Sequence, residues 1–398
     1  NHRKMVSQNL LRRQEYDKDA FVDDVLDYFE PYPINPTNKE NLTRIISNIL
    51  YHFDDVKSLW FENQTSNDSG VNPPISDHEP DIDTFDFLNV SFDEAHRSIL
   101  TAIRTKPFVL LAGLSGTGKS RLVRTLAYKT CFDPRLRSDH SKPGNFELVA
   151  VKPNWHDSGE LLGYVSRING EKYMTTAFLK FVAKAWKFRN VPFFLCLDEM
   201  NLAPVEQYFA EYLSIVETRA THSGKAKSDF LISKSQFENP ELYARLINDL
   251  ELNNEVGFAD GISIPPNLIV VGTVNMDETT HSFSRKVLDR AMTFEMNTVD
   301  LSSGLSSDTS DWSYPEFFVP YDNVVGDYSA GSEVVDLYPE SQAVIEYLIR
   351  LNDILDGTPF KIAYRVRDEF LIYCHYYRLF EDKRENWIDT ALDEMTVM

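Results

Sequence analysis

The sequence contains little cysteine and no long hydrophobic run. Its three cysteines, Cys131, Cys196 and Cys374, are too few and too scattered for a disulfide framework or a zinc site. This usage predicts a reducing, cytoplasmic compartment. The longest apolar runs, such as VPFFLCL from Val191, have the length of a strand and are too short to span a membrane. The first residues lack the apolar segment of a secretion signal, so we expect no membrane partner.

Basic residues are also scarce. Forty Lys and Arg stand against 61 Asp and Glu, which gives a formal net charge of −21. This balance argues against broad, non-specific binding of nucleic acid, although a local basic groove stays possible. A chain of 398 residues predicts two or three domains. It starts at Asn1 and has no evident terminal signal, so we expect parts of the natural protein to lie outside it.

The order of apolar and polar segments divides the chain into four parts. Residues 1–63 have helical spacing, and residues 64–84 have the Pro-rich, acidic composition of a linker. Residues 85–298 form an α/β core with a polar insertion at about 221–261. Residues 299–398 predict a helical lid domain, which we expect to be incomplete.

Four segments of the core are apolar on both faces and predict buried strands. They are FVLLAG from Phe108, FELVAVK from Phe146, PFFLCLDE from Pro192 and NLIVVGTVN from Asn267. Because helical segments alternate with them, we expect an α/β fold with a parallel sheet that is flanked by helices.

A phosphate-binding loop follows the first of these strands. Residues 113–120, GLSGTGKS, satisfy the pattern G-x-x-x-x-G-K-[ST] in full. Glycines turn backbone N–H groups inward, and the next helix adds its N-terminal dipole. A chance glycine turn is the alternative, but the strand before and the helix after favour a nucleotide site. The candidate nucleotide-binding residues of this loop are Gly113, Leu114, Ser115, Gly116, Thr117, Gly118, Lys119, Ser120 and Arg121.

Two acids end the strand PFFLCLDE. Asp198 is expected to hold Mg²⁺ together with the Ser120 hydroxyl, and Glu199 to orient or deprotonate an attacking water. A helix N-cap pair is the alternative interpretation of these acids. Asn275 ends the strand NLIVVGTVN and is placed to contact the γ-phosphate or the water, although a lone Asn there is usually a turn former.

In combination these stretches resemble an AAA+ ATPase, and more narrowly its McrB-like branch, which is related to the dynein and MoxR groups. The segments that carry the resemblance lie between about Phe108 and Phe294. They are GLSGTGKS, NWHDSGELLGYV, LCLDEMNLAPVEQYFAEYLSIVE and PPNLIVVGTVNMDETTHSFSRKVLDRA.

The resemblance implies a role for each candidate residue. Lys119 and Ser120 correspond to Walker A, Asp198 and Glu199 to Walker B, and Asn275 to sensor 1. It further implies an arginine finger that enters a neighbouring subunit's site, with Arg290 as first candidate and Arg285 as second. Either Arg365 or Arg367 resembles a sensor-2 arginine that reaches back to the phosphates. Such proteins generally form hexameric rings.

McrB-like proteins are nucleotide-hydrolysing motors of DNA restriction and anti-phage defence. The resemblance therefore implies a McrC-like nuclease partner, with DNA bound through the complex or a missing reader domain. The stretch Val274-Asn275-Met276-Asp277 departs from the McrB pattern, Met-Asn-x-x-Asp-Arg, so the substrate is either ATP or GTP. A MoxR-like chaperone that remodels proteins and a non-catalytic nucleotide-binding scaffold are the alternative functions.

Some residues are ambiguous. His156 and Asp157 could suggest acid–base chemistry, but the resemblance makes them part of a loop. Four basic residues of the insertion form a candidate patch, for which a solvated loop is the simpler interpretation: Arg219, His222, Lys225 and Lys227. Tyr364 and Tyr376 are interpreted as core residues of the helical domain.

Overall fold

The computed structural model describes residues 94–398 apart from residues 169, 223–224, 254, 256, 277–280, 298–312, 316–317 and 381–385. The chain divides into two compact units, residues 1–91 and residues 92–398. The predicted N-terminal helical region and linker therefore lie outside the described residues, all of which belong to the second unit.

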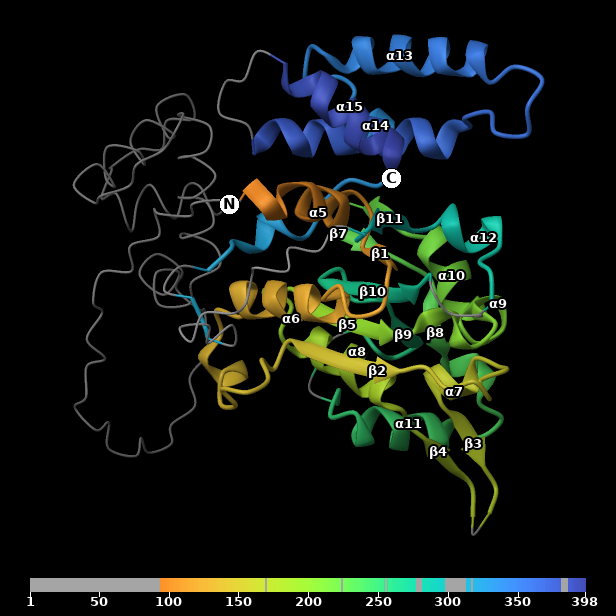
Figure 1. Ribbon diagram of the computed structural model, residues 1–398. Coiled ribbons are helices and arrows are strands. Elements are labelled where there is room, and N and C mark those ends of the chain that lie inside the picture. Colours follow the sequence, from red (N-terminus) through yellow and green to blue (C-terminus); the bar gives the residue numbers. More distant parts are fainter. Residues whose placement is uncertain are drawn as a thin grey trace, which may run out of the picture. The chain divides into compact units, whose positions relative to one another are not determined.

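A five-stranded parallel sheet forms the centre of this unit (Figure 1). Its strand order is β11-β1-β10-β5-β2, and every neighbouring pair is parallel. The strands are β1 (Phe108–Gly113), β2 (Phe146–Ala150), β5 (Phe193–Asp198), β10 (Leu268–Asn275) and β11 (Met292–Glu295). All four predicted strands are present, which confirms the α/β fold class. Because parallel strands share one direction, all the segments that leave their carboxyl ends meet at one edge.

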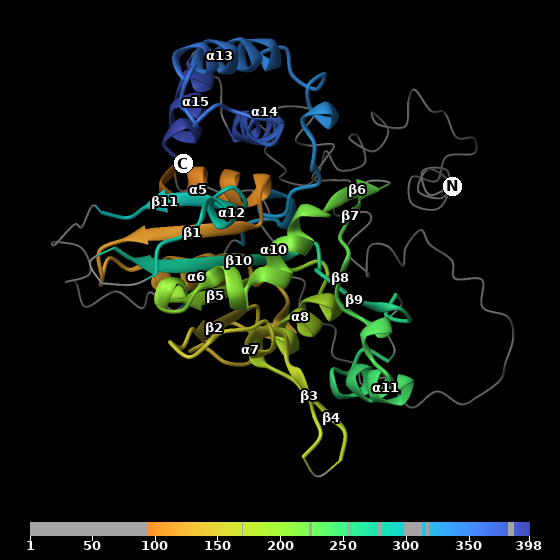
Figure 2. The ribbon, with the colours of Figure 1, turned by 90° about the vertical axis from the view of Figure 1, so that its right-hand side faces the viewer.

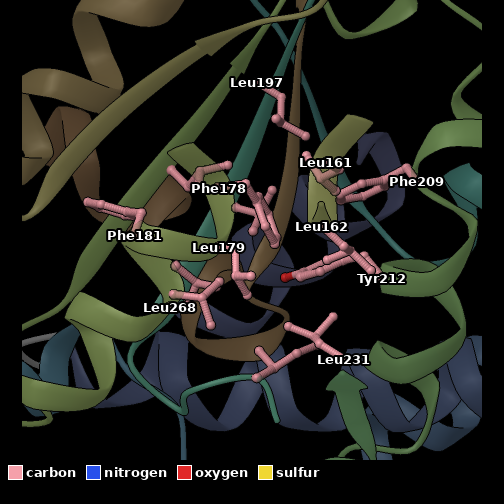
Figure 3. Close-up of a cluster of buried hydrophobic side chains, with 14 of the residues drawn as sticks. Leu161, Leu162, Phe178, Leu179, Phe181, Leu197, Phe209, Tyr212, Leu231 and Leu268 are labelled. Atoms are coloured by element: carbon pink, nitrogen blue, oxygen red, sulfur yellow. The ribbon is translucent and has the colours of Figure 1, made fainter. Parts of the chain in front are cut away.

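Helices cover both faces of the sheet, and successive side chains of a strand enter different cores. Val109 and Leu111 of β1 join one buried cluster, whereas Phe108 and Leu110 join the other. Figure 3 shows part of the cluster that contains Phe108 and Leu110; in it, Phe178 and Leu179 of α8 meet Tyr212 of α10. The central strands are buried throughout, which explains why their sequences lack a polar face.

The helices of the sheet region follow the predicted segments. They are α5 (Glu94–Thr105), α6 (Lys119–Thr130), α7 (Gly159–Leu162), α8 (Ala177–Lys187), α9 (Val205–Tyr208), α10 (Ala210–Glu217) and α12 (Arg285–Leu288). Short 3-10 helices include η3 (Met200–Leu202). The segment from Leu202 to Glu217, which has the pattern of one helix, contains two, α9 and α10, that meet at Phe209.

The C-terminal region is helical, as predicted. It contains α13 (Ser341–Ile354), α14 (Tyr364–Leu379) and α15 (Trp387–Val397). Buried residues of α14 belong to the same hydrophobic cluster as α5 and one face of the sheet. The Arg104 guanidinium of α5 lies 4.0 Å from the centroid of the Tyr376 ring of α14. The helical region thus shares a core with the sheet region.

The polar insertion contains regular elements. They are β6 (Ala220–His222), β7 (Lys225–Lys227), β8 (Phe230–Ser233), α11 (Pro240–Asp249) and β9 (Gly261–Ser263). β6 pairs with β7, and β8 with β9. A separate hairpin, β3 (Tyr164–Ser166) with β4 (Lys172–Met174), stands away from the sheet (Figure 2). None of the described helices is long and apolar enough to cross a membrane.

Candidate active site

The predicted phosphate loop connects β1 to α6 at the carboxyl edge of the sheet. Gly113 has a φ of +155°, and a Cβ there would lie 2.4 Å from the carbonyl oxygen of Met296, so a side chain is excluded. Gly118 is the N-cap of α6 with a φ of 85°, a left-handed conformation that favours glycine. The loop thus leads directly into a helix N-terminus, where backbone N–H groups and the helix dipole favour an anion.

Lys119 is buried at the start of α6. Its Nζ donates hydrogen bonds to the carbonyl oxygens of Gly113, at 3.1 Å, and of Leu114, at 2.6 Å. The ammonium is therefore folded onto the loop itself, where it can neutralise phosphate charge. Arg121 lies in the first turn of the same helix and is exposed.

Asp198 and Ser120, the predicted magnesium pair, are in direct contact. Oδ1 of Asp198 accepts a hydrogen bond from Oγ of Ser120 at 2.7 Å and another from Oγ1 of Thr273 at 2.8 Å. A hydroxyl and a carboxylate side by side are hard oxygen ligands of the kind that Mg²⁺ takes alongside substrate phosphates and water. No cluster of three His, Cys, Asp or Glu ligands occurs in the described part of the chain. The Ser120 hydroxyl and the Asp198 carboxylate are the residues that could hold a magnesium ion here.

Glu199 occupies a left-handed conformation, with a φ of 53°. A non-glycine residue there costs about 1–3 kcal/mol and is typical of functional positions. Its backbone N–H donates to Oγ1 of Thr273 at 2.9 Å, and its Oε1 accepts from Nδ2 of Asn275 at 3.3 Å. The structure thus brings the side chains of Glu199 and Asn275 together.

Thr273 joins the two acids and was not predicted. Its hydroxyl donates to the side chain of Asp198 and accepts from the backbone of Glu199. Its position two residues before Asn275 is the signal that could have found it, because alternate residues of a strand point to the same face. A second missed residue, Asn201, donates from Nδ2 to the backbone oxygen of Asn275 at 3.5 Å.

Arg290, the first candidate for the arginine finger, lies at the other edge of the sheet. Val109, near the start of β1, pairs with Met292, and Arg290 precedes Met292. Arg290 is therefore near the amino ends of the strands, about 15–20 Å along β1 from the loop. Its Nη2 forms an ion pair of 2.6 Å with Oε2 of Glu217. Arg285 donates to the Pro359 oxygen at 2.9 Å.

The two sensor-2 candidates also lie away from the phosphate loop. Arg365 pairs with the second oxygen of Glu217 and so belongs to the same edge as Arg290. Arg367 pairs with Asp368 at 2.6 Å, and its guanidinium lies 4.9 Å from the centroid of the Tyr364 ring. The described contacts of both arginines are thus with residues outside the phosphate loop. A sensor-2 role for either arginine stays a prediction.

The ambiguous residues are mostly structural. The carboxylate of Asp157 accepts from the Gly159 N–H at 2.7 Å at the start of α7, and His156 is exposed. Arg219 is half-buried and donates to the Gly326 oxygen at 3.4 Å; burial lowers its pKa. The side chains of the other three patch residues lie outside the described residues.

The two tyrosines of α14 differ. Tyr376 is buried, as predicted, and its hydroxyl accepts from the backbone of Asp327 at 2.8 Å. The interpretation of Tyr364 as a core residue is wrong, because its side chain is 78% exposed. Its place in the first turn of α14, beyond the shared cluster, explains the difference.

Comparison with known proteins finds a distant structural similarity. No protein-family profile matches it, and neither does any curated protein sequence. Among solved structures, a provisionally assigned ATPase from Cytophaga hutchinsonii, determined at 2.00 Å, is similar over 76% of this chain and 78% of its own. The identity is 13% and the TM-score 0.36. At that level of similarity, the site rests on its own geometry: a phosphate loop and a carboxylate pair joined by Thr273 at the carboxyl edge of a parallel sheet.

Proposed function

We propose that the protein hydrolyses a nucleoside triphosphate, ATP or GTP, in the presence of Mg²⁺. The observation that carries this proposal is the contact of Asp198 with Ser120, made where Glu199 meets Asn275. These residues come from the phosphate loop and from two further strands, and a phosphate-binding turn alone does not require them. A nucleotide-binding scaffold that does not hydrolyse needs the loop but not Glu199.

Each residue has a distinct task in this reaction. The loop N–H groups and Lys119 hold the β- and γ-phosphates and offset their charge. Glu199 accepts a proton from the attacking water, whose oxygen bonds to the γ-phosphorus while the bond to the β-phosphate oxygen breaks. Asn275 holds the carboxylate of Glu199 in place through its amide. Magnesium, when held by Ser120 and Asp198, supplies further positive charge at the phosphates.

A ring of identical chains is the assembly that we propose, with six members as in the AAA+ proteins that the sequence resembles. The site at the carboxyl edge contains acids, an amide, Lys119 and the exposed Arg121, whereas Arg290 and Arg365 make their described contacts at the amino edge. In the head-to-tail ring that we propose, the amino edge of one chain faces the nucleotide of the next. An arginine supplied from a neighbour stabilises the charge that develops on the transferred phosphoryl group.

DNA restriction with a McrC-like nuclease is the biological role that we propose for this motor. The support is the resemblance of four sequence segments to the McrB-like branch. The net charge of −21 fits DNA contacts made through a partner or a reader domain better than contacts made by this acidic surface.

The first experiment compares hydrolysis of ATP and GTP, with and without Mg²⁺, by the natural chain and by Glu199→Gln. Glu211→Gln is the matched control, because Glu211 is an exposed carboxylate on α10. We expect turnover that depends on Mg²⁺ and is reduced about 10²- to 10⁴-fold in Glu199→Gln alone. Equal turnover in the two variants would contradict the assignment of the hydrolytic site.

A second experiment separates the biological roles. Hydrolysis is measured with duplex DNA, with the protein encoded beside this chain, and with an unfolded protein client. Stimulation by DNA or by a nuclease supports the restriction motor. Stimulation by the client alone supports the MoxR-like chaperone instead.

A further inference from the structure

Glu217 joins arginines from two distant segments of the chain. It is the last residue of α10, and its two carboxylate oxygens are divided between Arg290 and Arg365. Arg290 precedes β11, whereas Arg365 lies in the first turn of α14. One side chain of the sheet region therefore holds both guanidinium groups at the same point.

The cluster of Glu217, Arg290 and Arg365 carries one net positive charge at an accessible surface. The side chains of Glu217 and Arg365 are 33% and 48% exposed, and that of Arg290 is 16% exposed. Two guanidinium groups this close repel each other, and the carboxylate between them offsets that repulsion. The hydrogen bond from Arg290 lowers the pKa of Glu217, so the carboxylate is ionised at neutral pH.

The backbone around the cluster is fixed by further contacts. The Lys106 ammonium forms a 2.6 Å ion pair with Glu369 and donates to the backbone oxygen of Asp289 at 3.1 Å. Glu369 lies one turn after Arg365, on the same face of α14. The guanidinium of Arg290 also donates to the Lys286 oxygen. The start of α14 is therefore anchored beside Arg290 at two successive turns.

We propose that Glu217 is a positioning residue, which holds Arg290 and Arg365 as one preorganised pair for the triphosphate bound by a neighbouring chain. This inference rests on the proposed function. Arg365 is long and half-exposed, and without Glu217 its guanidinium is free to leave Arg290. A displacement of about 1 Å in a catalytic group can reduce a rate about 100-fold. Glu217 thus acts on catalysis through the two arginines and does not itself touch the nucleotide.

The test compares Glu217→Gln with Glu211→Gln, a carboxylate of the same helix. The readouts are kcat and KM for the preferred nucleotide, the affinity for the transition-state mimic ADP–aluminium fluoride (GDP if GTP is preferred), and the mass of the assembly in solution. We expect kcat to fall about 10- to 100-fold and the mimic to bind more weakly by a similar factor. KM should change less than about twofold, because the nucleotide's own loop is intact. The control should match the natural chain.

A double variant tests whether the residues act as a unit. If Glu217 works through the arginine pair, Arg365→Ala should slow turnover no further in the Glu217→Gln background. If the two substitutions instead reduce kcat by factors that multiply in the double variant, the inference is overturned. An unchanged kcat also overturns it, as does loss of the assembly in Glu217→Gln, since that result makes the residue structural. Failure of the proposed function looks different, because then Glu199→Gln also turns over normally.

Discussion

The two edges of the parallel sheet carry opposite and complementary chemistry. At the carboxyl edge, Asp198 and Glu199 meet the phosphate loop, and Thr273 connects them by hydrogen bonds. At the amino edge, Arg290 and Arg365 share the single carboxylate of Glu217. In the proposed reaction, the first edge holds the phosphates and the attacking water, and the second supplies cations for the charge that develops during phosphoryl transfer.

Under the proposed function, this difference explains why one chain contains the parts of a site but not the whole site. Strand direction places every βα loop at one edge, so residues that precede the strands are far from it. Residues of the amino edge can reach a nucleotide only if a second chain presents its carboxyl edge to them. Substitutions at each edge therefore test the two halves of the site separately.

Removing the loop lysine should have the largest effect. Lys119 donates to two carbonyl oxygens of the phosphate loop and is its buried cation. We expect Lys119→Ala to reduce hydrolysis by about 10³-fold or more and to weaken nucleotide binding, because the phosphates lose their neutralising charge. Turnover and binding of a fluorescent nucleotide check this. Lys180→Ala, an exposed lysine of α8, is the control; equal effects of the two changes would contradict the assigned role.

Removing Arg290 at the amino edge should slow hydrolysis but leave nucleotide binding nearly unchanged. We expect Arg290→Ala to lower kcat about 10²- to 10³-fold while nucleotide affinity changes little, since the loop of its own chain is untouched. Arg285→Ala should have a smaller effect, because Arg285 contacts Pro359 and lies over the Phe360 ring. A larger loss in Arg285→Ala would reverse the assignment of the finger.

Thr273 tests the carboxyl edge without changing a charge. Thr273→Val keeps the shape but removes the donor to Asp198 and the acceptor for the Glu199 N–H. We expect a loss of about 1–3 kcal/mol in the free energy of unfolding and a higher Mg²⁺ requirement for turnover. Urea unfolding and a Mg²⁺ titration measure these. Thr105→Val, which removes a hydroxyl bonded to the Thr101 oxygen, should leave the Mg²⁺ requirement unchanged; a shift of similar size in both variants contradicts the role of Thr273.

The smallest expected effect is on stability: acid should remove the contribution of Glu217 to the free energy of unfolding. Its pKa lies below the usual 4.5, chiefly because Arg290 hydrogen-bonds to it. A depressed pKa in the folded state means that the stabilisation is present above pH 4.5 and is lost as the pH falls through the folded-state pKa. At pH 7 we expect the free energy of unfolding of the natural chain to exceed that of Glu217→Gln by less than about 1 kcal/mol, because solvent partly screens the ion pair. The difference should disappear in acid; a difference that grows below pH 4.5 would contradict this.

The sequence predicts the sheet, the phosphate loop and the acid pair because each depends on local pattern. Continuous apolar segments predict buried strands, and GLSGTGKS predicts a backbone shape. Thr273 escaped prediction, since a threonine in a strand is ordinary until its neighbours are known. Glu217 escaped for a related reason: it is significant only through residues far away along the chain. The position of Arg365 depends on how α14 packs, and no local pattern contains that information.

Mixing two inactive chains tests most directly the claim that the two edges complete each other. Glu199→Gln retains its arginines, and Arg290→Ala retains its phosphate loop and acids. In assemblies made by co-expressing both in equal amounts, about a quarter of the sites combine an intact Glu199 with an intact Arg290 from the neighbouring chain. We predict that hydrolysis returns to roughly that fraction of the natural rate, far above either variant alone. A mixture no more active than the average of the two variants would contradict the claim.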